Sequence, residues 1–514
     1  MAKQGAESRQ NRRPVALSGS MSTKLDSQVG FAVEGNIAKG GVGLLAAVCL
    51  AALPWEAAGE AAGEAAGEAA GAGVSLAGLD WSQAIEVASG NAHRGPWRQN
   101  DSEFDFVDDA AVALNDEGFV AVAWADLPTH DIFLQVYGPE GEALLEEPSN
   151  ISRSPGIFSW IPRLVMTNGG SLDEISVHVI WQDIVFRGGG HGGEIFSTSS
   201  TDGGRTFGPL VNLSDVIEGS GKGRTDPQRW HNGSYDLFLC PAGVLHAAWT
   251  EYEGRLWYSR STDGGVTFSG RAHITGGGGG DEPLPTRAPS IAADGGGRVV
   301  IAHTVGDIVD ADIHLWVSAD GGAEFSGPVV PHESAGYADA PRVVFDGAGA
   351  LHLVYAESLG GPDGAPYVDG DGERRSGAPQ LMYTRAAAGG MDFIPARPVF
   401  EGGAGDDPAA RAFPFLRADA RGHLHLAWER FADFPGRPQG LGYARSEDGG
   451  ETFGTPILVP GLGGAAAEGF NGSQQGLLSS KLGVSSSGRV ALANGLFVGG
   501  ERSEVRVVAA EPGS

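Results

Sequence analysis

The chain has 514 residues, with 35 lysines and arginines against 64 aspartates and glutamates, and a formal net charge of −29 at pH 7. Such an acidic surface argues against nucleic acid and anionic membrane surfaces as partners, because both repel it. The 2 cysteines, Cys49 and Cys240, cannot form a disulfide framework, and no Cys-x-x-Cys or histidine-rich spacing indicates zinc. The 83 glycines follow no collagen period and instead predict many tight turns.

Residues 1–55 are expected to form a signal or anchor region. The uncharged apolar run 40–53 follows Lys39 and is short for a spanning helix, which needs about 20 residues, but suits the core of a signal peptide. A start at Met21 would leave a more typical segment ahead of this core. Val48 is bulkier than the small residue that a lipoprotein box requires before its cysteine, and an uncleaved anchor is the alternative. We predict export to the cell surface, the periplasm or the medium.

Residues 56–79 are expected to form a linker, because the unit Glu-Ala-Ala-Gly repeats four times from Glu56 to Gly71. A glycine at every fourth position costs a helix about 1 kcal/mol each relative to alanine. The segment has no hydrophobic face to bury, so it is typical of a solvated spacer.

From residue 80 to 514 the sequence repeats itself, which indicates a repeat architecture. A motif of the form Ser-x-Asp-Gly-Gly-x-x-Phe recurs at 200–207, 261–268, 318–325 and 446–453, with a decayed copy at 386–393. Asp-Gly supplies a turn that tolerates positive φ, and the aspartate side chain accepts bonds from the amides of the turn. The motif therefore predicts a hairpin in each repeat.

Each repeat also contains an alternating apolar strand that ends on an aromatic residue or histidine, with an acidic residue at or near its end. The copies are 120–126, 178–183, 245–251, 352–357 and 425–429, with a looser one at 299–307. Another strand and a glycine-rich turn precede each copy, as at 289–295 and 341–347. Period-2 alternation with regular turns predicts antiparallel strands, four in each repeat.

These strand pairs predict an all-β, seven-bladed β-propeller of four-stranded antiparallel blades. The expected blade starts lie near residues 105, 162, 234, 288, 340, 412 and 480. The last repeat lacks its outermost strand, and the segment 84–90 resembles that strand, so we expect this N-terminal strand to close the ring. A six-bladed propeller is the alternative.

The repeated turns resemble the Asp box of sialidases and related propellers, over about 420 residues. The resemblance implies that the functional face lies opposite these turns. It also implies an arginine triad for the sugar carboxylate, a tyrosine nucleophile and carboxylates for acid/base work. The first arginine of that family precedes an Ile-Pro pair, but here Trp160 precedes Ile161-Pro162, which argues against classical sialidase chemistry. The looser match is Arg287, before Ala288-Pro289.

Four residues are therefore catalytic candidates: Arg287, Asp183, Glu251 and Glu357. Arg287 is a candidate for binding substrate, with a salt bridge at a strand end as the alternative. The three carboxylates recur by repeat position, which also fits a structural role in bonding neighbouring blades.

The segment 224–232 collects cations and an aromatic residue in one predicted loop, a combination suited to stacking on a sugar and bonding its hydroxyls. The candidate ligand-binding residues are Arg224, Arg229, Trp230 and His231. An ordinary surface loop with a half-buried tryptophan is the alternative. The acidic segment 369–373 resembles only part of a calcium loop. We expect no cofactor and no metal ligands, although a calcium ion in the ring centre stays open.

Two functions fit the sequence. The first is a non-catalytic propeller that binds glycans or cell-surface proteins through its loop face, and the second is an extracellular exo-glycosidase of sialidase type. The regular repeats, the missing arginine motif and the acidic charge favour the first. Fold alone does not decide between them. We expect a monomer with no nucleic-acid partner, tethered to a membrane if the apolar segment is retained.

Overall fold

In the computed structural model all described residues belong to one compact unit, within residues 54–514. The structure describes residues 74–513 apart from 97, 186–192, 217–218, 225–229, 233, 252–253, 275–284, 307–310, 335, 361–366, 369–373, 376, 401–409, 433–436, 464–466 and 469–479. The expected signal region and most of the expected linker lie outside this range. No helix among the described residues is long and apolar enough to cross a membrane.

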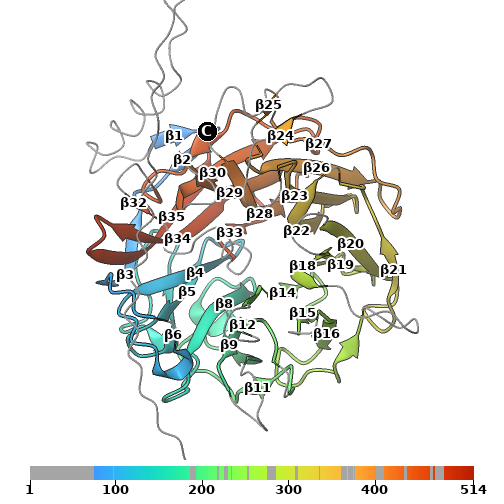
Figure 1. Ribbon diagram of the computed structural model, residues 1–514. Helices are drawn as coiled ribbons and strands as arrows, with labels where there is room; N and C mark the ends of the chain where they lie inside the picture. Colours follow the sequence, from blue (N-terminus) through green and yellow to red (C-terminus); the bar gives the residue numbers. More distant parts are fainter. Residues whose placement is uncertain are drawn as a thin grey trace, which may run out of the picture. The chain divides into compact units, whose positions relative to one another are not determined.

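Seven sheets of antiparallel strands form a ring, which confirms the seven-bladed β-propeller and shows that the six-bladed alternative is wrong (Figure 1). Blade 1 is β4 (Val107–Leu114), β5 (Val120–Asp126), β6 (Asp131–Tyr137) and β7 (Ser149–Asn150). Blade 2 is β8 (Ser159–Met166), β9 (Val177–Asp183), β10 (Glu194–Ser200) and β11 (Val211–Asn212). Blade 3 is β14 (Tyr235–Leu239), β15 (Leu245–Thr250), β16 (Leu256–Ser261) and β17 (Ala272–His273). Blade 4 is β18 (Thr286–Ala293), β19 (Val299–Val305), β20 (Asp312–Ser318) and β21 (Ser326–Val329).

The remaining blades follow the same order from the inner to the outer strand. Blade 5 is β22 (Tyr337–Phe345), β23 (Leu351–Ser358), β26 (Gln380–Ala386) and β27 (Arg397–Pro398). Blade 6 is β28 (Ala410–Ala418), β29 (Leu424–Phe431), β30 (Pro438–Ser446) and β31 (Ile457–Leu458). The short elements outside the blade meanders are β12 (Lys222–Arg224), β13 (Trp230–Asn232), β24 (Tyr367–Val368), β25 (Arg374–Arg375), and the 3-10 helices η1 (Gln99–Asp101) and η2 (Leu172–Glu174).

Blade 7 joins both ends of the folded chain. It contains β33 (Leu482–Val484), β34 (Val490–Val498), β35 (Arg502–Pro512) and the N-terminal strand β3 (Ile85–Asn91), which pairs with β35. The predicted closing strand is thereby confirmed. The same sheet also takes in β1 (Val74–Leu76), β2 (Leu79–Trp81) and β32 (Ala467–Glu468). Closure of this kind leaves no gap between the first and last blades.

The second strands carry most of the core. In β9 every residue is buried, and Trp181 is 0% exposed. A second strand of a propeller has a blade on either side, so both of its faces pack against protein rather than one facing water. The alternating pattern of the sequence therefore marks which side chains point to which neighbouring blade.

The inner strands of five blades share an irregularity. In each, the register against the second strand shifts, and a residue with positive φ sits inside the shift. These residues are Asp109, Ile161, Ala288, Ala340 and Phe413, and all but Asp109 are followed by a proline. Such bulges are sites where a strand re-aims its side chains. In blade 5 Asp339 pairs with Ala356 and Arg342 with Val354, so these two residues share one face of the blade despite their spacing.

Four inner-strand side chains bond the backbone of the next inner strand, and we call these four residues the inter-blade belt. Each residue lies at the same position in its repeat. It pairs with a residue of the second strand, and that residue comes directly before the strand's aromatic residue or histidine. The bonds run from Arg163 Nε to the Tyr235 carbonyl (3.0 Å), from Ile291 N to the Asp236 carboxylate (3.0 Å), from Val343 N to Ser290 Oγ (3.2 Å), and from Arg342 Nε to the Pro414 carbonyl (3.1 Å). These four side chains are buried or partly buried between the blades. Each bond therefore helps to hold one blade to the next.

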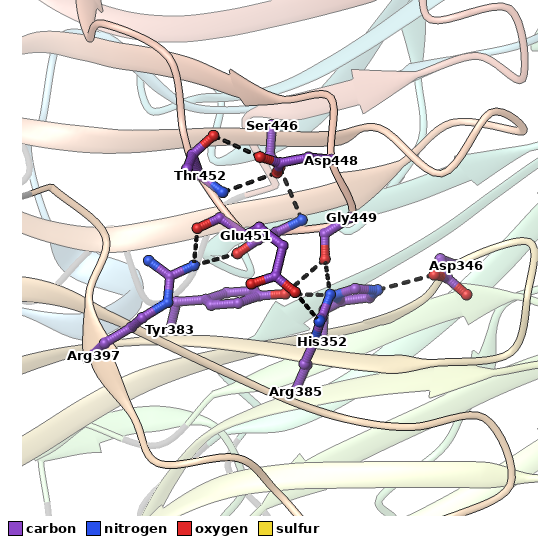
Figure 2. A network of polar contacts seen from close by, with 11 residues as sticks. Asp346, His352, Tyr383, Arg385, Arg397, Ser446, Asp448, Gly449, Glu451 and Thr452 are labelled. Carbon is purple, nitrogen blue, oxygen red and sulfur yellow. Dashed lines mark hydrogen bonds and ion pairs between the residues drawn. The ribbon is translucent and has the colours of Figure 1, made fainter.

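The repeated Ser-x-Asp-Gly-Gly turns connect the third and fourth strands. In blade 6 the Asp448 carboxylate accepts bonds from Ser446 Oγ (2.8 Å), Thr452 N (2.8 Å) and Thr452 Oγ1 (2.6 Å), and Gly450 N donates to Ser446 Oγ (2.8 Å) (Figure 2). The turns of blades 2 and 3 repeat this pattern, and blade 4 repeats its serine and aspartate bonds. These bonds lower the pKa of Asp448 to about 2, although burial alone would raise it, so the turn is held by an ionised carboxylate.

The second glycine of each turn lies against the third strand of the preceding blade. At Gly450, φ is +86°, and a Cβ atom would fall far inside contact distance of the Tyr383 hydroxyl of blade 5. That hydroxyl is held by His352 Nδ1 (2.8 Å), and Arg385 donates to the Gly449 carbonyl (2.6 Å), as Figure 2 shows. The equivalent contacts join Gly204 to Leu134, Gly265 to Ser199, and Gly322 to Tyr258. The glycine is therefore needed for the fit between blades as well as for the turn.

Replacing Gly450 by alanine tests this contact. We expect Gly450→Ala to lose about 1 kcal/mol for the positive φ, as any alanine would there, and a further 1–3 kcal/mol or so for overpacking against Tyr383. Gly449→Ala is the matched control, since its φ is +67° but its Cβ would meet Arg385 at an ordinary 3.6 Å. Urea unfolding of both variants measures the difference, and equal losses would contradict the inter-blade contact.

Candidate functional site

The face opposite the Asp-Gly-Gly turns is where the inner strands begin and the second strands end, because successive strands run antiparallel. We call it the loop face. The blade-to-blade connections of this face include 275–284, 401–409 and 469–479, which lie outside the described residues. The site is therefore built from the strand ends that the structure describes.

Arg287 is held at the start of β18 by three different partners. Its Nε donates to the Asp339 carboxylate (3.1 Å), one Nη to the Tyr337 hydroxyl (2.8 Å), and the other to the Gly306 carbonyl (3.1 Å). The Tyr337 hydroxyl in turn donates to Asp339 (2.6 Å), and Thr304 Oγ1 donates to the other oxygen of that carboxylate (2.8 Å). Arg287, Tyr337 and Asp339 thus form one polar cluster between blades 4 and 5, which we call the arginine–tyrosine cluster.

The electrostatics of this cluster keep its groups in defined states. The Arg287 and Asp339 side chains are 13% and 11% exposed. Burial alone would lower the pKa of Arg287, but Asp339 and Tyr337 raise it above its ordinary value, so the guanidinium stays charged. Burial and the Asp339 charge raise the pKa of Tyr337 well above its usual range. Tyr337 is therefore a neutral phenol that donates its proton to a carboxylate.

The positive-φ bulge explains how Arg287 and Asp339 come to face each other. Both precede the positive-φ residue of their own inner strand, at the repeat position that Trp160 occupies in blade 2 and Asp108 in blade 1. Sequence reasoning named Arg287 from this position but missed Tyr337 and Asp339. The available signal was the Asp-Ala-Pro run at 339–341, which matches Arg-Ala-Pro at 287–289 in blade 4.

Asp183 lies at the end of β9, 2% exposed. Its carboxylate accepts bonds from Ser159 Oγ (2.7 Å), Trp181 Nε1 (2.6 Å) and Ser154 Oγ (2.9 Å). Burial raises its pKa to about 6, against the lowering effect of these bonds. Asp183 thus holds a proton more tightly than an ordinary aspartate and braces the connection between blades 1 and 2.

Glu251 and Glu357 are also engaged. Glu251 accepts from Arg271 (2.8 Å), whose guanidinium lies over the Trp257 ring, and Glu357 accepts from Ser334 Oγ. Asp183, Glu251 and Glu357 belong to blades 2, 3 and 5, and among the described residues no hydrogen bond or ion pair joins them to one another or to Arg287. The carboxylate beside Arg287 is Asp339 instead.

The predicted ligand-binding segment forms a hairpin. β12 and β13 are antiparallel, with Arg224 opposite Trp230 and Gly223 opposite His231. Arg229 lies outside the described residues, as does the acidic segment 369–373. The hairpin stands in the connection between blades 2 and 3, hence on the loop face.

A second polar cluster, not predicted from the sequence, lies where blade 7 meets blades 6 and 1. Lys481 Nζ donates to Glu429 (2.6 Å) and to Asn494 (2.8 Å), and the Lys481 and Glu429 side chains are 3% and 0% exposed. Burial, followed by the charge of Asp109, raises the pKa of Asp108 beside them. The deep burial of the Lys481–Glu429 pair, and its bonds across the closing blade, fit a role of this cluster in closing the ring.

No group of three or more histidine, cysteine, aspartate or glutamate side chains able to hold a metal ion occurs within the described part of the chain. Cys240 is a buried free thiol.

The strand pairing defines the chain as a seven-bladed β-propeller, and comparison with known proteins adds only a general likeness. No family model matches the sequence, and no curated protein matches it. Among solved structures it is similar to the polysaccharide lyase Uly1 (TM-score 0.49, 12% identity, 84% of this chain and 100% of that one) and to an ulvan lyase (0.46, 11%, 82% and 95%). It is also similar to an α-L-arabinanase from Penicillium chrysogenum (0.42, 16%, 65% and 89%). At these values the similarity does not bear on chemistry.

The raised pKa of Asp183 predicts a pH-dependent contribution to stability. The pKa of Asp183 is about 6 in the folded protein, above its ordinary value of 3.8. The contribution to stability is therefore fully present below pH 3.8 and is lost as the pH rises through about 6. The loss is at most about 3 kcal/mol.

We expect wild type to lose stability relative to Asp183→Asn as the pH rises from about 4 to about 7, measured by urea unfolding across that range. His178 and His246, whose pKa burial lowers to about 4, also affect stability in this range, but they are common to both proteins and cancel in the difference. A difference that does not change with pH would contradict the assignment.

Proposed function

We propose that this chain is a sialidase-like propeller that binds an acidic glycan at the arginine–tyrosine cluster on its loop face. The observation that carries the proposal is the guanidinium of Arg287, fixed between Asp339 and Tyr337 at the start of the inner strands. Among the described residues its bonds leave two of the guanidinium N–H donors for a ligand. A guanidinium held in this way suits the carboxylate of a sugar acid.

The net charge of the chain favours binding of the glycan at one local cation over binding across a broad charged surface. The chain carries a net charge of −29, so an acidic glycan approaches against the overall field and needs a fixed cation at its destination. The Asp339 charge keeps Arg287 in place and charged but also reduces its net positive potential. We therefore expect recognition of one carboxylate at short range, together with neutral sugar contacts, rather than strong attraction at long range.

The four Asp-Gly-Gly turns support the sialidase-like assignment, because their serine, aspartate and glycine bonds match what the Asp-box resemblance implies. The hairpin β12–β13 on the same face supplies Arg224 and Trp230 as candidates for further sugar contacts. We also propose that residues 1–55 direct export, which would place the loop face in contact with extracellular or periplasmic glycans.

An exo-glycosidase with a tyrosine nucleophile is the second candidate. The observation in its favour is the 2.6 Å bond from the Tyr337 hydroxyl to Asp339, since a carboxylate in that position accepts the proton as the oxygen attacks. The raised pKa of Tyr337 argues the other way, because the phenol is far from ionised at neutral pH. For this reason we rank binding above catalysis.

The test measures binding and turnover in the same proteins. We expect residues 74–514 to bind carboxylate-bearing sugars on a glycan array, and Arg287→Ala to weaken binding at least about tenfold through loss of the charged contact. Arg271→Ala is the matched control, because Arg271, like Arg287, pairs with a carboxylate (Glu251, 2.8 Å) and lies over an aromatic ring (4.4 Å), but in blade 3.

Fluorogenic glycosides, sialosides included, separate the two candidates. Under the binding proposal wild type releases no fluorophore, and Tyr337→Phe retains binding. Turnover in wild type that disappears in Tyr337→Phe would replace the binding proposal by the glycosidase. Equal binding by wild type and Arg287→Ala would overturn both.

A further inference from the structure

A row of polar contacts crosses from blade 5 to the Asp-Gly-Gly turn of blade 6, and Figure 2 shows it in full. Asp346 Oδ2 lies 3.2 Å from His352 Nε2, and His352 Nδ1 lies 2.8 Å from the Tyr383 hydroxyl. That hydroxyl lies 3.3 Å from the carbonyl oxygen of Gly449, which belongs to the turn of blade 6. We call Asp346, His352 and Tyr383 the histidine–tyrosine relay.

The relay is shielded from water and is held in place at its acidic end. The His352 side chain is 1% exposed, and Tyr383 is 0% exposed. The Asp346 carboxylate also accepts the backbone amides of Ala348 (2.9 Å) and Ala350 (2.8 Å) in its own turn. Buried polar groups take their hydrogen-bond partners from the protein around them. Each proton of the relay is therefore assigned to one of these contacts.

With His352 neutral, the relay has too few protons for all of its contacts. An ionised carboxylate only accepts, so the contact with Asp346 places the ring proton of His352 on Nε2. Nδ1 is then an acceptor, and it takes the single proton of the Tyr383 hydroxyl. In this state Tyr383 has no proton left for the Gly449 carbonyl, which is bonded instead by Arg385 (2.6 Å).

A second proton on His352 changes this arrangement. Both nitrogens of an imidazolium donate, so Nδ1 now donates to the Tyr383 oxygen, and the hydroxyl proton has to turn to another acceptor. The Gly449 carbonyl is within reach at 3.3 Å, and a carbonyl oxygen has two lone pairs, of which Arg385 uses one. Asp346 balances the new charge at 3.2 Å. The contacts for both states are therefore already present, and only protons change place.

We propose that His352 is a protonation switch between blades 5 and 6, in which a second proton on the ring turns the Tyr383 hydroxyl from His352 to the Gly449 carbonyl. In the neutral state the tyrosine bond stays within blade 5. In the protonated state it crosses the interface, beside the close contact of Gly450. The switch goes beyond the proposed glycan binding and does not depend on it.

The charged groups around His352 come from several packed elements. Asp346 in the turn before β23 faces Nε2, and Arg385 of β26 pairs with His352 across the strands. Arg385 is itself paired with Glu451 of the next blade, and Arg397 of β27 lies over the Tyr383 ring (5.3 Å). Burial lowers the pKa of His352, Asp346 raises it, and Arg385 lowers it.

The sign of the effect on stability follows from the lowered pKa of His352. Because the folded-state pKa lies below the ordinary 6.5, the contribution of the neutral ring is fully present above pH 6.5 and is lost as the pH falls through the folded-state pKa. The charge of Asp346 and the new bond to Gly449 both reduce this loss. The switch thus preserves the contact between blades 5 and 6 on acidification.

Blade 3 offers an internal comparison that lacks two parts of the switch. His246 Nδ1 lies 2.7 Å from the Tyr258 hydroxyl, as in the relay. Cys240 stands six residues before this histidine, the place that Asp346 has in blade 5. Within the described part of the chain, the Tyr258 hydroxyl has no hydrogen-bond partner other than His246. Burial lowers the pKa of His246 to about 4.

The pKa of His352, measured by NMR on the full chain with ¹⁵N-labelled histidine, tests the switch by its sign. His352→Gln identifies its signal among those of the 13 histidines. Tyr383→Phe should weaken proton binding by His352 about fivefold and so lower its pKa, because tyrosine makes two bonds in the protonated state and one in the neutral state. A tyrosine that only donates to Nδ1 favours the neutral ring, so its removal would raise the pKa.

A raised or unchanged pKa of His352 in Tyr383→Phe would overturn the proposal. So would a ring that stays neutral down to the pH at which the protein unfolds. Tyr258→Phe is the matched control, and it should raise the pKa of His246, since Tyr258 has no second acceptor to turn to. Shifts of the same sign in the two blades would contradict the part assigned to Gly449.

Urea unfolding gives an independent readout of the same switch. The increase in the unfolding equilibrium constant caused by Tyr383→Phe should be about fivefold larger where His352 is protonated than at pH 7, since one more hydrogen bond is then lost. The increase caused by Tyr258→Phe should not grow on acidification. A loss in Tyr383→Phe that is the same at both pH values would show that the tyrosine bond does not move.

Discussion

The close approach of each blade to the next is the constraint on which the rest of this structure depends. Two sets of contacts maintain it. Near the axis, the inter-blade belt carries hydrogen bonds from one inner strand to the backbone of the next, as from Arg163 to the Tyr235 carbonyl. Further out, the second glycine of each turn lies against the preceding blade, as Gly450 does against Tyr383. Neither set leaves room for a larger side chain or a wider gap, because interiors are packed to crystal density.

The same constraint positions the functional candidates. The bulge before each proline turns the start of the inner strand so that Arg287 of blade 4 meets Asp339 and Tyr337 of blade 5. A few residues further along the same two strands, Ser290 and Arg342 bond the backbone of the next inner strand. One repeated backbone irregularity therefore lies between two polar regions, the arginine–tyrosine cluster near the loop face, which we assign to a glycan, and the deeper inter-blade belt. In a repeat fold the same backbone position recurs in every blade and can carry a different side chain in each.

Much of the fold could be predicted from the sequence because it depends on local chemistry. The Asp-Gly-Gly turns at 200–207 and 446–453 specify hairpins within eight residues, and the missing outer strand of the last repeat implied that 84–90 would complete it. The site was predictable only in part. Arg287 stood out by its place before Ala288-Pro289, whereas Asp339 and Tyr337 belong to another blade, and nothing local indicates which blade a side chain will face. Asp183, Glu251 and Glu357 recur in the sequence, but the structure gives each a separate partner: Ser159, Arg271 and Ser334.

The sequence by itself thus determined the repeat, the turn chemistry, the number of blades and the strand that closes them, since these follow from patterns a few residues long. Only the tertiary structure decided that Arg287 bonds Asp339 and Tyr337, and that Lys481 pairs with Glu429 across the closing blade. Those contacts join residues about 50 or more positions apart, and they arise when the ring closes and brings the inner strands around a common axis.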